Sequence, residues 1–499
     1  MTRAEGHTIG VTLFIAALGV STLASGADKP RQTTSRQPTS RQPATAGSSR
    51  PDETVRLRGP LHEAFAQPLA GADEPGQTVS RRPGTPLDES PAPFKPNSPN
   101  TIWIPGYWGW EPADGEYLWV PGVWRVPPPG MRWVPGYWRE QEAGWQWVRG
   151  FWYPLKEPRL RYLPPPPAAQ EEAAPALAAN EFAVPGHWSY VRGQYLWNRG
   201  FTARHKKDWV WMPSHYAWTP RGMLFLPGYW DHALNSRGFV MAPMRGAAES
   251  RTVAGPLQPK VAVNLADLPE ALFRGERFGH FYFGSYFADD VAGLEPWFTS
   301  EGQPDPVFAY ERWRMGGHDW AEKLAARYDR RRQDAELRPA VHFTESKSPP
   351  DARATSRTPE LGLFMTSPAL ARVSARSAVQ VGPESLPRIV QNSASARLLA
   401  TQRAKFEASG AAASGETPLA LYLPSPIEPL EHDRATSRVP PTTAGQFVPG
   451  VSGRQVPGAS DAKLPGMSGR TLPGVDVHIP GTVAPGVIPG ADTGGKLPR

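Results

Sequence analysis

Large apolar residues return at a fixed interval between residues 101 and 245. A six-residue motif of the form Trp-x-Pro-Gly-x-Trp, or a close variant, begins at positions 103, 119, 133, 147, 183, 197, 211 and 225. These starts are 16, 14 and 14 residues apart in the first four copies, and 14 apart throughout the second four. A constant interval of this kind indicates a tandem repeat. The repeat also explains why 16 of the 19 Trp residues lie between Trp103 and Trp230.

Within one copy, large apolar residues alternate with other residues. A bulky side chain stands two places before the first Trp, and a turn-forming residue stands three or four places before it. Alternating aromatic residues bounded by such turns are typical of short antiparallel strands. The predicted fold is therefore mainly β, a meander or barrel-like array with one or two accessory helices and long disordered flanks. The turn positions are Gly115, Gly130, Gly144, Gly193, Asp208 and Gly222.

The Pro-Gly pair in the middle of a copy predicts a bend between two short strands. Trp119 and Trp124 are five residues apart, so a regular strand would place their rings on opposite faces. Pro121 lacks a backbone donor and Gly122 permits a positive φ, so a bulge or corner there can bring both rings to one face. The predicted bends lie at Pro105, Gly106, Pro121, Gly122, Pro135, Gly136, Pro185, Gly186, Pro227 and Gly228.

The repeated Trp residues have two interpretations. Their recurrence in each copy suits one interior that neighbouring copies share, because the rings of a single copy cannot offset the entropy of ordering fourteen residues. Exposed rings could also form a strip that stacks on sugars. Both interpretations concern Trp103, Trp108, Trp119, Trp124, Trp133, Trp138, Trp147, Trp152, Trp188, Trp197, Trp211 and Trp230.

The start of the chain predicts export. Residues 9–20 are a continuous apolar stretch, and Ser25-Gly26-Ala27 fits a cleavage site, so residues 1–27 are assigned as a signal peptide. Twelve helical residues are too short to cross a bilayer, which argues against a permanent anchor. No later stretch is long and apolar enough to span a membrane. We therefore expect a protein secreted to the periplasm, the cell envelope or the medium.

The flanks of the array are polar and rich in Pro. Residues 28–100 are expected to be a disordered stalk, because Pro, Ser, Thr, Gln and Arg dominate them. Residues 153–181 contain a Pro/Ala-rich spacer that divides the array into two halves, 101–152 and 182–245. Residues 431–499 repeat Val/Leu/Ile-Pro-Gly and are expected to form a disordered tail.

Two regions between the array and this tail contain predicted helices. Residues 246–345 form a mixed aromatic segment, with a strand at residues 261–263 and a helix over 319–337 for which Asp319 is the expected N-cap. Residues 346–430 are mostly irregular, with a second helix over about 385–409.

Charge and composition exclude several classes of protein. The net charge of +7 is spread over 54 basic and 47 acidic residues without a recognition motif, so nucleic acid is not an expected partner. The absence of Cys removes disulfides, thiolate metal sites and Cys nucleophiles.

No specific catalytic, cofactor or metal motif occurs in the sequence, so none of these roles is assigned to any residue. The polar residues weighed for such roles are better explained by ordinary structure. His187 occupies the position of Tyr107 in its motif, which favours aromatic filling over metal binding. Solvated loops or helix faces explain the carboxylates and the triple arginine, and ring packing explains the other histidines. These residues are His205, His215, His232, His280, Asp289, Asp290, Glu295, Arg330, Arg331 and Arg332.

The runs WIPGYW, WVPGVW and WVPGYW resemble the WXXGXW (YXWGXW) repeats of secreted bacterial proteins. The segments PGYW, GFVMAP and HFYFGSYF that follow are similar to larger members of that family. The resemblance covers roughly residues 101–335 and implies a secreted repeat protein without catalytic residues. The expected function is structural or adhesive in the cell envelope, with envelope polysaccharide or another envelope protein as partner. A polysaccharide- or peptidoglycan-binding module is the alternative, and an unrecognised hydrolase is the third.

Overall fold

The computed structural model describes residues 55–245, 256–275, 279–288, 291, 293–299, 305–341, 363–366, 378–410, 413 and 419–427. The expected signal peptide, the beginning of the expected stalk and the expected Pro-Gly tail lie outside these residues.

The eight motif copies form four antiparallel hairpins, each built from two consecutive copies. An inner strand pair is closed by a turn, and an outer pair continues it beyond the Pro-Gly bends. Hairpin 1 contains β4 (Ile102–Ile104), β5 (Tyr107–Glu111), β6 (Glu116–Val120) and β7 (Val123–Arg125). Hairpin 2 contains β8 (Met131–Val134), β9 (Tyr137–Gln141), β10 (Gly144–Val148) and β11 (Phe151–Pro154). Hairpin 3 contains β13 (Glu181–Val184), β14 (His187–Val191), β15 (Gln194–Asn198) and β16 (Phe201–Arg204). Hairpin 4 contains β17 (Trp209–Met212), β18 (His215–Thr219), β19 (Gly222–Leu226) and β20 (Tyr229–His232).

The mainly β, antiparallel repeat array predicted from the sequence is confirmed. Among the described strands, the hydrogen bonds between array strands stay within one hairpin, so the array is four separate bent ribbons and not one continuous meander or barrel. The prediction of turns at six residues is also confirmed, because all six have a positive φ, from 61° at Gly115 to 140° at Gly222. Asp208, at φ 68°, takes the left-handed conformation that short polar side chains tolerate.

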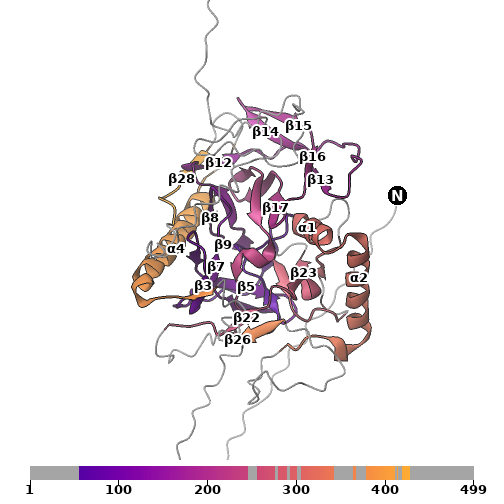
Figure 1. Cartoon of the computed structure of the whole chain (residues 1–499). Helices are drawn as coiled ribbons and strands as arrows, with labels where there is room; N and C mark the ends of the chain where they lie inside the picture. Colours follow the sequence, from indigo (N-terminus) through magenta and orange to yellow (C-terminus); the bar gives the residue numbers. More distant parts are fainter. Residues whose placement is uncertain are drawn as a thin grey trace, which may run out of the picture. The chain divides into compact units, whose positions relative to one another are not determined.

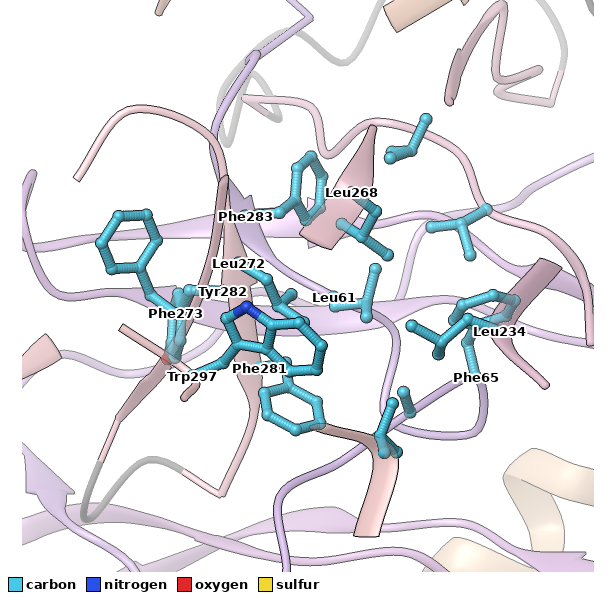
Figure 2. Packing of buried hydrophobic residues seen from close by; sticks show 14 of the residues in the cluster. Leu61, Phe65, Leu234, Leu268, Leu272, Phe273, Phe281, Tyr282, Phe283 and Trp297 are labelled. Atoms are coloured by element: carbon cyan, nitrogen blue, oxygen red, sulfur yellow. The ribbon is translucent and has the colours of Figure 1, made fainter. Parts of the chain in front are cut away.

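Residues 55–100 are not a stalk. They contribute β1 (Gly59–Pro60), β2 (Thr78–Val79) and β3 (Phe94–Pro96). These strands pair in turn with β24 (Phe281–Phe283), β10 and β27 (Ala378–Gln380). Figure 2 shows Leu61 and Phe65 in the same apolar cluster as Phe281 and Trp297, and both side chains are fully buried. The prediction failed because composition reports average hydrophobicity, whereas the few apolar residues of this segment meet apolar surface that the array supplies.

The spacer between the two halves of the array also contains structure. Its β12 (Arg159–Leu163) lies between β19 of hairpin 4 and β28 (Leu419–Tyr422) in a four-stranded sheet. The spacer and the end of the described chain therefore extend the β-structure of hairpin 4.

A second sheet follows the array. It has the strand order β1-β24-β23-β25 and contains β23 (Leu272–Gly275), β24 (Phe281–Phe283) and β25 (Leu294–Pro296). The strand predicted at residues 261–263 is β22 (Val261–Val263), which pairs with β26 (Phe364–Thr366). The short β21 (Gly238–Phe239) adds a third strand to hairpin 1 beside β7. Three 3-10 turns, η1 (Leu234–Ser236), η2 (Leu268–Ala271) and η3 (Ala335–Leu337), complete the region.

The described part of the chain contains three α-helices, which lie against these strands. The helix predicted over 385–409 is α4 (Leu386–Ala408), which is labelled in Figure 1 and is preceded by η4 (Pro383–Ser385) and β27 (Ala378–Gln380). It contacts β4, β8 and β9. Helix α1 (Pro306–Arg314) was not predicted, and it contacts β17 and α2. Its start is marked in the sequence by Asp305, which caps Val307, and by Pro306 in the first turn.

The helix predicted over 319–337 is α2 (His318–Gln333). The expected N-cap at Asp319 is wrong, because Gly317 occupies the cap position and Asp319 lies in the first turn. Gly317 has a φ of 73° and reverses the chain between α1 and α2, which sets the start of α2 one residue earlier.

Candidate functional site

The Trp residues of each hairpin meet in pairs across its two arms. In hairpin 2, Trp133 faces Trp152 and Trp138 faces Trp147 in the strand register. The paired rings are 5.3 and 5.4 Å apart between centroids and lie at steep angles to each other, an arrangement that aromatic pairs prefer. The corresponding pairs elsewhere are Trp103–Trp124, Trp108–Trp119, Trp188–Trp197 and Trp211–Trp230.

The predicted bends bring rings five residues apart to one face. Trp147 and Trp152 follow one another across the bend at Gly150, and their indole N–H groups donate to consecutive residues of the N-terminal segment. The acceptors are the Glu63 carboxylate at 3.1 Å and the Ala64 carbonyl at 3.2 Å. Since both donors reach the same segment, both rings lie on the same side of hairpin 2.

The motif glycines are needed for close approach and not for a positive φ. None of the motif glycines is among the described residues with a positive φ, so the bends do not use the conformation that glycine permits. A Cβ at Gly122 would instead lie 2.3 Å from the ring of Trp103, and one at Gly136 would lie 2.5 Å from the ring of Trp147. The indole of one arm rests on the bare backbone of the other, and this contact explains why the motif requires glycine.

Acidic residues from outside the repeat accept hydrogen bonds from the bend glycines of the first three hairpins. In hairpin 1 the Glu89 carboxylate accepts the N–H groups of Gly106 and Gly122 at 3.1 and 2.8 Å. In hairpin 2 the Glu63 carboxylate accepts those of Gly136 and Gly150 at 3.3 and 3.1 Å. These N–H groups would otherwise be left without acceptors where the strand ladder is interrupted.

Hairpin 3 has the same kind of hydrogen bond between a carboxylate and a bend glycine, but here the carboxylate is exposed to solvent. Glu172 accepts the N–H of Gly200 at 2.8 Å and the indole N–H of Trp197 at 2.9 Å. None of the three acidic residues stands out in the sequence, because Glu63 and Glu89 lie in the expected stalk and Glu172 lies in the spacer.

Hairpin 4 departs from the motif and compensates locally. Ser214 stands where the other copies have glycine, and its hydroxyl accepts the N–H of Gly228 at 2.9 Å. Phe225 replaces the Trp whose indole N–H meets the carboxylate in hairpins 2 and 3. The bend of hairpin 4 therefore does not require a carboxylate, and the two arms of this hairpin remain in register.

The bend of hairpin 2 is held from the opposite direction by α4. The Arg403 guanidinium donates to the carbonyls of Pro135 and Arg149, the residues that precede the two bend glycines, at 3.0 and 2.7 Å. Arg403 also pairs with Glu407 at 2.6 Å, and both side chains are fully buried. Glu63 and Arg403 thus satisfy the N–H and C=O groups of the same bend.

Burial dominates the electrostatics of these carboxylates. Loss of solvent around Glu63 raises its pKa to about 7, against the lowering effect of the N–H donors and of Arg403. Glu89 has its pKa raised to about 7 for the same reason, with the glycine N–H groups opposing the shift. These two groups therefore change charge near neutral pH.

The rings are enclosed, but not in one common interior. Among the described clusters, Trp133 and Trp152 belong to the largest, whereas the Trp103–Trp124 and Trp211–Trp230 pairs belong to two smaller ones. The expectation of a single shared interior is therefore wrong. Residues outside the repeat also contribute to the largest cluster, since Leu61 and Phe65 pack there with Trp133 and Trp152.

No Trp of the array is exposed. Three of the twelve predicted Trp residues, Trp138, Trp188 and Trp197, are partly buried, and the other nine are buried. The rings consequently do not form an exposed row on the described part of the chain.

Stacking between neighbouring hairpins explains why an aromatic residue stands directly before the second Trp of the motif. Tyr107 of hairpin 1 stacks on Trp147 of hairpin 2 with 4.9 Å between ring centroids. His187 of hairpin 3 stacks in the same way on Phe225 of hairpin 4, at 5.6 Å. The interpretation of His187 as an aromatic filler is confirmed by this contact.

The other polar candidates lie in separate places. His205 stacks on Trp313, His232 packs on Trp209, and His280 contacts the Tyr107 hydroxyl at 2.9 Å. His215 contacts a backbone carbonyl, Glu295 pairs with Arg274, and Arg331 pairs with Glu270. Asp289 and Asp290 lie outside the described residues.

The described residues contain no group of three or more His, Asp or Glu side chains that could hold a metal ion. In the same part of the chain, no helix is both long and apolar enough to cross a membrane.

One large cavity opens where the array is least covered. It has a volume of about 940 Å³ and lies between hairpin 3, the spacer residues 172–177 and α1. Phe182 and Phe201 of hairpin 3, Trp211 of hairpin 4 and Tyr310 of α1 supply its aromatic walls. Its volume is sufficient for a ligand of substantial size.

Comparison with known families agrees with the geometry. The model of the WXXGXW repeat, described as two copies, matches residues 102–125, 129–152, 184–200 and 208–231. Each match falls on one hairpin, so the two copies of the family model correspond to the two arms. The array therefore consists of WXXGXW repeats. Neither a curated protein nor a solved structure matches the chain.

Proposed function

We propose that this chain is an exported, non-catalytic protein of the bacterial cell envelope, in which the repeat array is a rigid scaffold with a structural or adhesive role. The observation that carries the proposal is the use of the repeated groups. The paired indoles pack against each other, and the acidic residues beside them accept backbone N–H groups. Groups engaged in this way serve the framework and are not available for chemistry.

Export is supported by the apolar residues 9–20 and by Ser25-Gly26-Ala27. The full chain with a C-terminal tag, produced in a bacterial host, is expected in the envelope or the medium with an intact mass that starts at Asp28. A Leu13→Arg variant, which breaks the apolar stretch, serves as the control and should remain inside the cell. Wild-type protein that retains Met1 and stays in the cytoplasm would contradict the proposal.

The scaffold role is tested by retention on envelope material. The exported full chain is expected to sediment with isolated envelopes, while remaining inactive on polysaccharide and peptide substrates. Hydrolysis of either kind of substrate by the purified chain would refute a non-catalytic role.

Polysaccharide binding through exposed Trp and Tyr rings loses its main support, because no array Trp is exposed. Binding of a ligand would instead have to use the cavity beside hairpin 3, whose lining favours a different chemistry.

A further inference from the structure

Hairpin 3 lacks one of the two ring pairs that the other hairpins share. The outer strands of hairpins 1, 2 and 4 carry Trp103–Trp124, Trp133–Trp152 and Trp211–Trp230 directly opposite each other. At the same register position hairpin 3 has Ala183 opposite Thr202. The sequence alone marks these positions as departures from the motif, but it does not show what occupies the space.

The glycine that would receive the missing ring is still present. In hairpin 2 a Cβ on Gly150 would lie 2.5 Å from the ring of Trp133. At Gly200, the equivalent residue of hairpin 3, the nearest atoms belong to Glu172 and to backbone, without an aromatic ring among them. Gly200, Ala183 and Thr202 all line the cavity of about 940 Å³. The space freed by the missing indoles is thus continuous with an opening large enough for a ligand.

We propose that this cavity binds an uncharged planar aromatic group of about the size of indole, which takes the place of the missing ring pair. Phe182 and Phe201 provide ring faces and edges from hairpin 3, and Trp211 provides them from hairpin 4. Gly200 offers bare backbone of the kind on which the indoles of the other hairpins rest.

The polar groups of the lining favour an uncharged ligand. Glu181 pairs with Arg204 at 3.4 Å, and Arg274 pairs with Glu295 at 3.1 Å. Asp305 caps α1, and Glu172 accepts from Gly200 and Trp197. Because each carboxylate of the lining already has a donor within the chain, and Arg274 has a carboxylate, a charged ligand would have to compete with these contacts. Arg312, which also lines the cavity, is exposed and lies over the ring of Phe308, so solvent hydrates its charge without a ligand.

The ring could belong to a free small molecule or to a Trp side chain of a polypeptide. This proposal gives a chemistry to the interaction role proposed above, but it depends only on the cavity. Failure of export or of envelope retention would therefore leave it unaffected.

Calorimetric titration of the purified full chain with two probes tests the proposal and separates the two sources. Indole represents a free aromatic molecule, and N-acetyl-L-tryptophanamide represents a peptide-borne ring. At least one is expected to bind with a dissociation constant on the order of a millimolar or below. Tighter binding of the amide would assign the site to a polypeptide, and binding of indole alone to a small molecule.

The matched variant refills the cavity with the residues of the motif. Ala183→Trp combined with Thr202→Trp should weaken binding by about tenfold or more, since the new indoles occupy the ligand position. Leu196→Trp adds a ring at an exposed position of hairpin 3 outside the lining and should bind as the wild type does. Thermal unfolding of each variant verifies that it folds. If the double variant does not fold, Ala183→Leu replaces it, because leucine fills part of the cavity with a smaller side chain.

The proposal is overturned if neither probe binds the wild-type chain at millimolar concentration. It is equally overturned if a folded, filled variant retains full affinity, or if maltotriose binds where both aromatic probes fail.

Discussion

Hairpins 2 and 3 share an inner Trp pair and a bend held by a carboxylate, but they have different surroundings. Both place one Trp opposite another beside a Pro-Gly or Arg-Gly bend, and both use a carboxylate on a bend glycine. Hairpin 2 is enclosed by the N-terminal segment and α4, and its Glu63 is only 2% exposed. In hairpin 3 Glu172 is exposed, the two Trp residues are partly buried, and Leu196 is 53% exposed. The repeat thus specifies the local geometry, whereas neighbours outside the repeat determine burial and with it the stabilisation.

The largest difference in stability between equivalent variants of hairpins 2 and 3 is expected for the Trp whose indole donates to the carboxylate. Trp147→Ala should lower the free energy of unfolding by about 3–5 kcal/mol, because it empties a buried site and removes a donor from Glu63. The equivalent Trp197→Ala should cost about 1–2 kcal/mol, since its ring is already partly solvated. Urea unfolding of the two variants measures both values. Equal losses would show that burial does not distinguish the two hairpins.

A smaller difference is expected from the bend glycines. Gly150→Ala should destabilise the protein by about 1–3 kcal/mol, because the new methyl group meets the ring of Trp133 and the Glu63 carboxylate. Gly200→Ala should cost less, about 1 kcal/mol, since its methyl group would meet the movable end of Glu172 and the Val184 carbonyl, both at 2.7 Å, but no aromatic ring. The shift in thermal midpoint of each variant provides the measurement. A larger shift for Gly200→Ala would contradict the role assigned to the indole contact.

The smallest difference is expected from the carboxylates, and it depends on pH. Burial raises the pKa of Glu63 from 4.5 to about 7, so the folded chain binds more protons than the unfolded chain between these values. The free energy of unfolding should therefore fall as the pH rises from about 4.5 to about 7, and Glu89 should contribute in the same direction.

Glu63→Gln should flatten part of this slope and, at pH 7, lower the stability by about 1–2 kcal/mol, because the amide nitrogen cannot accept a glycine N–H. Glu172→Gln is the matched control at an exposed site and should lower the stability at pH 7 by less than about 0.5 kcal/mol. Urea unfolding at several pH values measures how the free energy of unfolding of each variant depends on pH. An unchanged slope in Glu63→Gln would show that this carboxylate does not titrate in the window.

Much of the local structure could be predicted from short stretches of sequence. The turn residues Gly115 and Asp208, the bends and the helix over 385–409 depend on neighbouring residues, and the structure contains all of them. The reason for the motif glycine could not be found in this way, since the ring that requires it belongs to the opposite arm. The structure of residues 55–100 was also missed, because a segment that covers another surface needs only a few apolar residues of its own.

The sequence by itself determined the repeat and the positions of its turns and bends, because these follow from propensities and contacts between neighbouring residues. Only the tertiary structure decided which carboxylate meets which bend and which hairpin is buried. Glu63 reaches Gly136 from 73 residues away, and Arg403 reaches Pro135 from 268 residues away. Contacts over such separations leave no periodic signal along the chain, since they depend on where separate segments come to lie in the folded molecule.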